Sequence, residues 1–234
     1  MLPFARRTTR AFPASVFGEN DLPIRPSESL AILGKSGSGK STLLGLLGDL
    51  VETRGWARWT GTYACKTVAL MAQNFGLLPW FSVADKATIG SRLRGEILDT
   101  IRCDELLKSV GLYDVRDTLP DTLSAGMQQR TASARSLYDD ADLLLLDEPY
   151  SSLDAITRRQ MQELTRQSIS QRPLVLVTHD PDEACFMGDR IIILEGSPAQ
   201  LMEFDKSAGL ETLWQRVLQP SRTMRPIHPL RIPV

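Results

Sequence analysis

The sequence of 234 residues is poor in cysteine, in net charge and in long apolar runs, and each shortage excludes a class of protein. Its cysteines, Cys65, Cys103 and Cys185, are odd in number and far apart, so we expect buried, reduced thiols and no disulfide framework. A formal net charge of −1 provides no basic field for nucleic acid. No apolar run approaches the roughly 18 residues of a membrane-spanning helix. If the protein acts at a membrane, we expect another chain to hold it there.

The first 18 residues contain Arg6, Arg7 and Arg10 and no acidic residue, a composition also found in organellar transit peptides. The segment lacks the apolar core of a secretory signal, and it is needed to supply an early strand. We therefore expect the protein to reside in the cytoplasm.

An apolar stretch at residues 30–33 leads into a glycine-rich segment and then into an apolar helical pattern. Residues 34–41 match the pattern G-x-x-x-x-G-K-[ST], in which glycines let backbone N–H groups approach a phosphate. Lys40 would add a positive charge for the β- and γ-phosphates, and Ser41 an oxygen ligand for Mg²⁺. The helix that begins there directs the positive end of its dipole at the anion. The segment predicts a nucleotide phosphate site.

The rest of the chain alternates between strand and helix patterns, which predicts an α/β fold with a mainly parallel phosphate-loop NTPase sheet, an N-terminal antiparallel β part and an inserted helical subdomain. We expect one ATPase domain over residues 1–219, with the helical subdomain at about 76–138, and an extended tail rich in proline and arginine over 220–234. The predicted strands lie within 12–33 and at 56–62, 67–71, 141–147, 174–178 and 191–194, and the clearer helices at 96–101, 104–110, 128–137, 156–168, 182–187 and 211–218.

Polar residues follow several predicted strands. Asp147 and Glu148 end an apolar strand, where Asp147 can hold Mg²⁺ and Glu148 can polarise an attacking water. His179 could hydrogen-bond a γ-phosphate, although a histidine at a strand end is more often structural. Gln73 could ligate Mg²⁺ or orient water. Phe12 is either a ring that stacks on adenine or an ordinary core or surface residue.

Together these residues resemble the nucleotide-binding subunit of ABC transporters, over about residues 12–205. The resemblance assigns Walker A to residues 34–42, the Q-loop to Gln73, the signature motif to 123–130, Walker B with its catalytic glutamate to 143–148, the D-loop to 151–154 and the switch histidine to His179.

The resemblance implies ATP and Mg²⁺ as cofactors and two copies of the chain packed head to tail, with each ATP between one phosphate loop and the signature residues of the other copy. It implies that Glu148 positions water for attack while Lys40 and His179 stabilise charge on the γ-phosphoryl group. The implied residues are Glu148, His179, Lys40 and Gln73 for catalysis; Ser41, Gln73 and Asp147 for the metal; and Phe12, Gly34, Lys35, Ser36, Gly37, Ser38, Gly39, Lys40, Ser41, Thr42, Ser124, Gly126 and Asp154 for the nucleotide.

The resemblance also implies integral-membrane permease subunits as partners, a solute-binding protein as an indirect one, no nucleic acid, and a peripheral position at the cytoplasmic face of the cell membrane. Residues 73–80, with Leu-Leu-Pro-Trp, resemble the nitrate, sulfonate and taurine importer group. The candidate solutes are therefore nitrate, a sulfonate, taurine or a related small molecule.

Two features depart from the family pattern. Ala125 replaces the first glycine of the signature and adds a methyl group where backbone would approach nucleotide. The segment between residues 56 and 73 is short, so we expect trimmed antiparallel strands there.

Three alternatives stay open at this point. The chain could be an ABC ATPase that acts in repair, translation or cluster assembly without a permease, a monomeric phosphate-loop kinase, or a degenerate and inactive cassette. The near-neutral charge argues against the first, the signature-like stretch at 123–130 against the second, and the intact Lys40, Asp147, Glu148 and His179 against the third.

Overall fold

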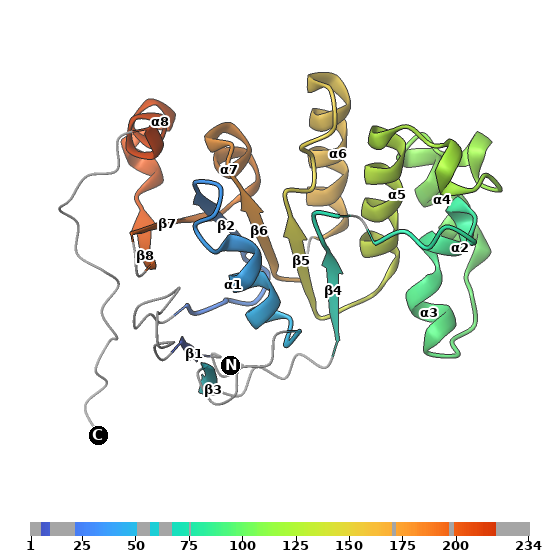
Figure 1. The fold of residues 1–234 in the computed structure, drawn as a ribbon, viewed down its shortest axis with the longest axis horizontal. Coiled ribbons are helices and arrows are strands. Elements are labelled where there is room, and N and C mark those ends of the chain that lie inside the picture. The colour runs from blue at the N-terminus through green and yellow to red at the C-terminus, as the bar shows by residue number, and fades with distance from the viewer. Residues whose placement is uncertain are drawn as a thin grey trace. The chain divides into compact units, whose positions relative to one another are not determined.

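The computed structural model describes residues 6–9, 22–50, 57–60, 67–74, 76–169, 172–196 and 199–218 (Figure 1). The chain divides into two compact units. The first comprises residues 1–66 and 171–234, and the second comprises residues 67–170. Phe12, Cys65 and the predicted tail at 220–234 lie outside the described residues.

The first unit is built on a sheet whose central strand leads into the phosphate loop. β2 (Ser29–Gly34) pairs in parallel with β6 (Leu174–Thr178) on one side and β7 (Arg190–Gly196) on the other. β8 (Ala199–Phe204) adds an antiparallel edge to β7. Every residue of β2 and β6 is buried, as expected for parallel strands covered on both faces.

Helices of the first unit pack apolar residues on this sheet. α1 (Lys40–Leu47) buries four leucines, and α7 (Pro181–Met187) contacts β2 and β6. After a 3₁₀ turn at Lys206–Ala208, α8 (Leu210–Leu218) inserts the fully buried Leu213 among side chains of β2, β7 and β8. A separate antiparallel pair joins β1 (Arg6–Thr9) to β3 (Ala57–Thr60).

The second unit combines a parallel strand pair with most of the helices. β4 (Val68–Met71) pairs in parallel with β5 (Leu143–Asp147). The helices are α2 (Val83–Ala87), α3 (Ile89–Leu93), α4 (Thr100–Ser109), α5 (Ala125–Tyr138) and α6 (Ala155–Ser168), with 3₁₀ turns at Tyr113–Val115 and Pro120–Thr122.

The predicted α/β class with a mainly parallel sheet is confirmed, because β2–β6, β2–β7 and β4–β5 are all parallel. The helix predicted at 96–101 is wrong over most of its length, since residues 96–99 are irregular and Asp99 is the N-cap of α4. Sequence patterns did not predict β8. The predicted domain boundaries stay predictions. No helix within the described ranges is long and apolar enough to cross a membrane.

Candidate functional site

The phosphate loop connects β2 to α1 in the first unit. Three of its positions require glycine, either for backbone conformation or for close packing. Gly37 and Gly39 have φ of +77° and +96°, in the left-handed region that favours glycine. At Gly34, an added Cβ would lie 2.8 Å from Ser38 Oγ and 2.9 Å from the backbone oxygen of Leu194. The loop is therefore pressed against β7 at its first residue and turns sharply at the other two.

Lys40 is ordered by the loop that it follows. Its side chain is 5% exposed, and its Nζ donates to the backbone oxygens of Gly34 at 2.8 Å and Lys35 at 3.0 Å. Gly39 is the N-cap of α1, so the first turn of the helix belongs to the same loop. An ordered ammonium group beside a helix N-terminus forms a site for an anion.

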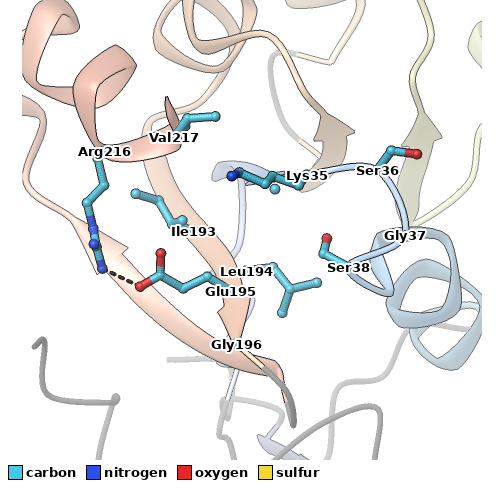
Figure 2. A pocket seen from close by; sticks show the side chains of 11 residues that line it. Lys35, Ser36, Gly37, Ser38, Ile193, Leu194, Glu195, Gly196, Arg216 and Val217 are labelled. Carbon is cyan, nitrogen blue, oxygen red and sulfur yellow. Dashed lines mark hydrogen bonds and ion pairs between the residues drawn. The ribbon is translucent and has the colours of Figure 1, made fainter. Parts of the chain in front are cut away.

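Figure 2 shows a cavity of about 240 Å³ beside the loop, lined by Gly34–Ser38, by the end of β7 and by the last turn of α8. The Lys35 side chain extends over it toward Val217. Ser38 Oγ is buried and has no hydrogen-bond partner among the residues that the structure describes. On the far wall Arg216 is paired with Glu195. The cavity therefore lies beside the phosphate loop, and its walls carry both cationic side chains and a hydroxyl group.

His179 lies near the start of the loop because of strand register. Leu33 of β2 is paired with Thr178 of β6, so Gly34 and His179 are the next residues at the same ends of neighbouring strands. Asp180 then caps α7 by accepting from the N–H of Asp182 at 2.9 Å, which fixes the backbone after the exposed His179. The structure thus brings this predicted residue and the phosphate loop together.

In the second unit, Asp147 and Glu148 follow the core strand as predicted. Asp147 is 6% exposed, and the half-buried Glu148 has a φ of +48°, which is rare for a residue with a side chain. Met71 of β4 is paired with Leu146 of β5, so the exposed Gln73 follows at the same end of this strand pair. The register thus gathers the predicted carboxylates and the glutamine at one edge.

A half-buried arginine holds the backbone shortly after Gln73. Arg135 of α5 donates to the backbone oxygen of Gly76 at 3.0 Å, and Gly76 has a φ of +55°. Burial lowers the pKa of Arg135 from its usual value. Sequence reasoning missed Arg135, because its partner is 59 residues away in the chain.

The signature stretch forms the start of α5. Ser124 is the exposed N-cap and its Oγ accepts from the N–H of Met127 at 3.3 Å. Ala125 is the exposed first residue of the helix, so its methyl group meets no crowding within this unit. A Cβ on Gly126 would lie 3.5 Å from the backbone oxygen of Ser152, at the turn that leads to Asp154.

Asp154 is the N-cap of α6. Its Oδ1 accepts from the N–H groups of Ile156 at 3.1 Å and Thr157 at 3.0 Å. These hydrogen bonds, the one from Thr157 foremost, lower the pKa of the Asp154 carboxyl group. Its carboxylate is committed to its own helix within this chain.

The predicted metal ligands form an oxygen-only set. Ser41 would provide a hydroxyl, Gln73 an amide and Asp147 a carboxylate, which is the chemistry that Mg²⁺ accepts when phosphate oxygens and water complete its shell. The described residues contain no group of three or more His, Cys, Asp or Glu that could hold a metal alone. The donor set therefore fits a metal that arrives with a nucleotide.

Comparison with known proteins gives one consistent result. Residues 18–151 match the family described as ABC transporter. The aliphatic sulfonates import ATP-binding protein SsuB 1 of Paracoccus denitrificans is 44% identical over 193 residues, which cover 81% of this chain and 77% of that protein. SsuB 3 of Nocardia farcinica, with the same description, is 46% identical over 177 residues, covering 74% and 68%.

A solved structure supports the same relationship. The dimeric ATP-binding cassette MJ0796, in a post-hydrolysis state bound to ADP and Pi, superposes with a TM-score of 0.71 at 27% identity. The match covers 83% of this chain and 94% of that one.

Proposed function

This chain belongs to the ABC transporter family, and from that premise we propose that it is the ATP-hydrolysing subunit of an importer for aliphatic sulfonates. The observation that carries the proposal is the phosphate loop with Lys40 held across it by two backbone oxygens. The substrate follows from the relatives, which are described as import proteins for aliphatic sulfonates. Residues 73–80 resemble the same segment of the nitrate, sulfonate and taurine importers, and a sulfonate is one of the solutes of that group.

The loop residues and the residues at the strand ends would divide the chemistry of ATP hydrolysis. The N–H groups of residues 34–42 and the Lys40 ammonium bind the phosphates. Glu148 holds the attacking water and accepts its proton. Lys40 and His179 stabilise the charge that develops on the γ-phosphoryl oxygens.

Ser41, Gln73 and Asp147 would hold Mg²⁺, which neutralises phosphate charge when bound. Because these ligands are a hydroxyl, an amide and one carboxylate, phosphate oxygens and water would complete the shell. The proposal therefore requires metal and nucleotide to bind together.

A second copy of the chain would complete each nucleotide site. In this arrangement Ser124 and Gly126 of one copy, with the turn at Asp154, face the ATP bound by the phosphate loop of the other. The dimeric state of MJ0796 with ADP and Pi supports this assembly. Separate permease subunits would hold the dimer at the cytoplasmic face of the membrane, and a solute-binding protein would deliver the sulfonate.

Uptake measured in a reconstituted system tests the proposal. The chain is assembled with its permease and solute-binding protein in liposomes, and accumulation of labelled ethanesulfonate, taurine and nitrate is compared at equal ATP. We expect ethanesulfonate to accumulate fastest, and uptake to stop with Glu148→Gln. Uptake of nitrate alone would contradict the substrate assignment, and undiminished uptake with Glu148→Gln would contradict the role of Glu148.

A further inference from the structure

A fully buried glutamine joins α5 to the turn that carries Glu148. Gln129 is 0% exposed, and its Nε2 donates to the backbone oxygen of Glu148 at 3.2 Å and to Ser151 Oγ at 3.4 Å. Its Oε1 accepts from the backbone N–H of Ser152 at 2.8 Å. The amide nitrogen and the amide oxygen of one side chain thus both form hydrogen bonds with the same turn.

The backbone conformation of this turn explains why the hydrogen bonds of Gln129 are needed. Glu148 has a φ of +48°, a left-handed conformation that is disfavoured for any residue with a Cβ. Its backbone oxygen also accepts from Ser151 Oγ at 3.2 Å and from the N–H of Ser151 at 3.4 Å. Those two bonds are local to the turn. The bond from Gln129 comes from a different element, α5, and the Tyr150 hydroxyl ties the same turn to α6 by donating to Thr165 Oγ1 at 2.9 Å.

The other end of α5 carries the signature serine. Ser124 is the N-cap of the 14-residue helix on which Gln129 lies. α5 and α6 contact each other and lie side by side in Figure 1. Because a helix moves as a rigid element, a displacement of Ser124 also displaces the Gln129 amide.

We propose that Gln129 is a positioning residue that holds the Glu148 backbone in its left-handed conformation and so aims the Glu148 carboxylate at the attacking water. This inference rests on the proposed function, in which Glu148 is the general base. Gln129 is fully buried, and in this role it acts only through Glu148. Through α5 it also links the base of one nucleotide site to the residues that contact the other nucleotide.

Two substitutions separate the hydrogen bonds. Gln129→Leu removes donor and acceptor at similar volume, and Gln129→Glu keeps an acceptor for the Ser152 N–H while it loses the amide donor to the Glu148 oxygen. Gln160→Glu, at an exposed position of α6, is the charge-matched control. We expect kcat for ATP hydrolysis to fall by about 10² in both Gln129 variants, because a small misplacement of a reacting group has that effect. KM for ATP stays within about 2-fold, since ground-state binding is unchanged.

A double-mutant cycle distinguishes positioning from general damage to the fold. Single-turnover hydrolysis is measured for Glu148→Gln alone and together with Gln129→Leu. If Gln129 acts through Glu148, the second substitution causes no further loss once the base is gone. Equal losses in both backgrounds would overturn the proposal, as would kcat within 2-fold of the unmodified chain in the Gln129 variants. Should Gln129→Leu fail to fold, the cycle is run with Gln129→Glu.

Failure of the proposed function can be distinguished from failure of the Gln129 proposal. If Glu148→Gln itself leaves hydrolysis unchanged, Glu148 is not the base, and the proposal for Gln129 falls with it. If Glu148→Gln stops hydrolysis while the Gln129 variants behave like the unmodified chain, only the positioning role is wrong.

Discussion

At the scale of single residues, Lys86 on α2 is a charged group with an unfavourable environment. Its side chain is 2% exposed, and its Nζ has no hydrogen-bond partner in the described part of the chain. Burial lowers its pKa from 10.5 to about 8, against an opposing effect of Asp121 and with a smaller contribution from Arg135 in the same direction as burial. The lysine therefore destabilises the fold at neutral pH.

The sign of the pH dependence follows from the direction of this shift. Below pH 8 the amine is protonated in both the folded and unfolded chain, and the buried charge lowers the free energy of unfolding. Between about pH 8 and 10.5 the folded protein releases the proton first, so stability rises with pH. The effect is at most roughly 3.5 kcal/mol, because the shift is about 2.5 pKa units and each unit corresponds to about 1.4 kcal/mol.

We expect Lys86→Met to increase the free energy of unfolding at pH 7 by about 1–3 kcal/mol, since it removes a buried charge at similar volume. The increase should shrink at pH 9.5. Urea unfolding at both pH values checks this, with Lys108→Met at an exposed position of α4 as the control. A variant that is less stable than the unmodified protein at pH 7 would show that Lys86 has a stabilising partner.

At the scale of elements, the phosphate loop depends on its contact with β7 as much as on its own sequence. A methyl group at Gly34 would lie 2.9 Å from the Leu194 backbone oxygen, whereas one at Gly37 would meet nothing within 4 Å. The sequence alone does not distinguish the roles of these two glycines. The structure assigns packing to Gly34 and backbone conformation to Gly37.

Substituting the two glycines separates these effects. We expect Gly34→Ala to lower the free energy of unfolding by about 2 kcal/mol through overpacking. Gly37→Ala should lower it by about 1 kcal/mol, because only the left-handed conformation opposes it. Urea unfolding of both variants gives the comparison. A larger loss for Gly37→Ala would mean that the loop moves away from β7 without resistance.

The elements that sequence predicts well are those whose signals are local. The apolar runs of β2, β5 and β6 and the glycine spacing of the loop are visible in short windows, and they were placed within two residues. The helix predicted at 96–101 was wrong because Asp99 caps α4, accepting from the N–H of Arg102 at 2.9 Å, so the helix begins only at Thr100. β8 was missed because its sequence, AQLMEF, has no regular alternation, and its pairing with β7 determines its structure.

The candidate site shows the same division. Lys40 belongs to a glycine-spaced loop pattern, and Asp147, Glu148 and His179 lie at the ends of apolar strands, so sequence motifs identify them. Gln129 lies inside the signature stretch at 123–130, but the sequence assigns it no role, and Arg135 lies outside every motif. Their partners Glu148 and Gly76 are 19 and 59 residues away. Only the fold reveals that they hold Glu148 and the turn after Gln73.

At the scale of the whole molecule, the proposed nucleotide site requires two copies of the chain. The residues predicted to contact ATP fall into two groups, the phosphate loop and the signature stretch. In the proposed assembly these groups belong to different copies at each nucleotide. A single chain would bind ATP through the phosphate loop but lack the contacts of Ser124 and Gly126.

Molecular mass in solution tests this requirement most directly. The chain with Glu148→Gln binds MgATP and hydrolyses it only at the slow residual rate that single-turnover measurements detect. Light scattering after size exclusion gives its mass with MgATP, with MgADP and without nucleotide. We predict a dimer with MgATP and a monomer in the other two conditions. A chain with Glu148→Gln that stays monomeric at millimolar MgATP would contradict the account.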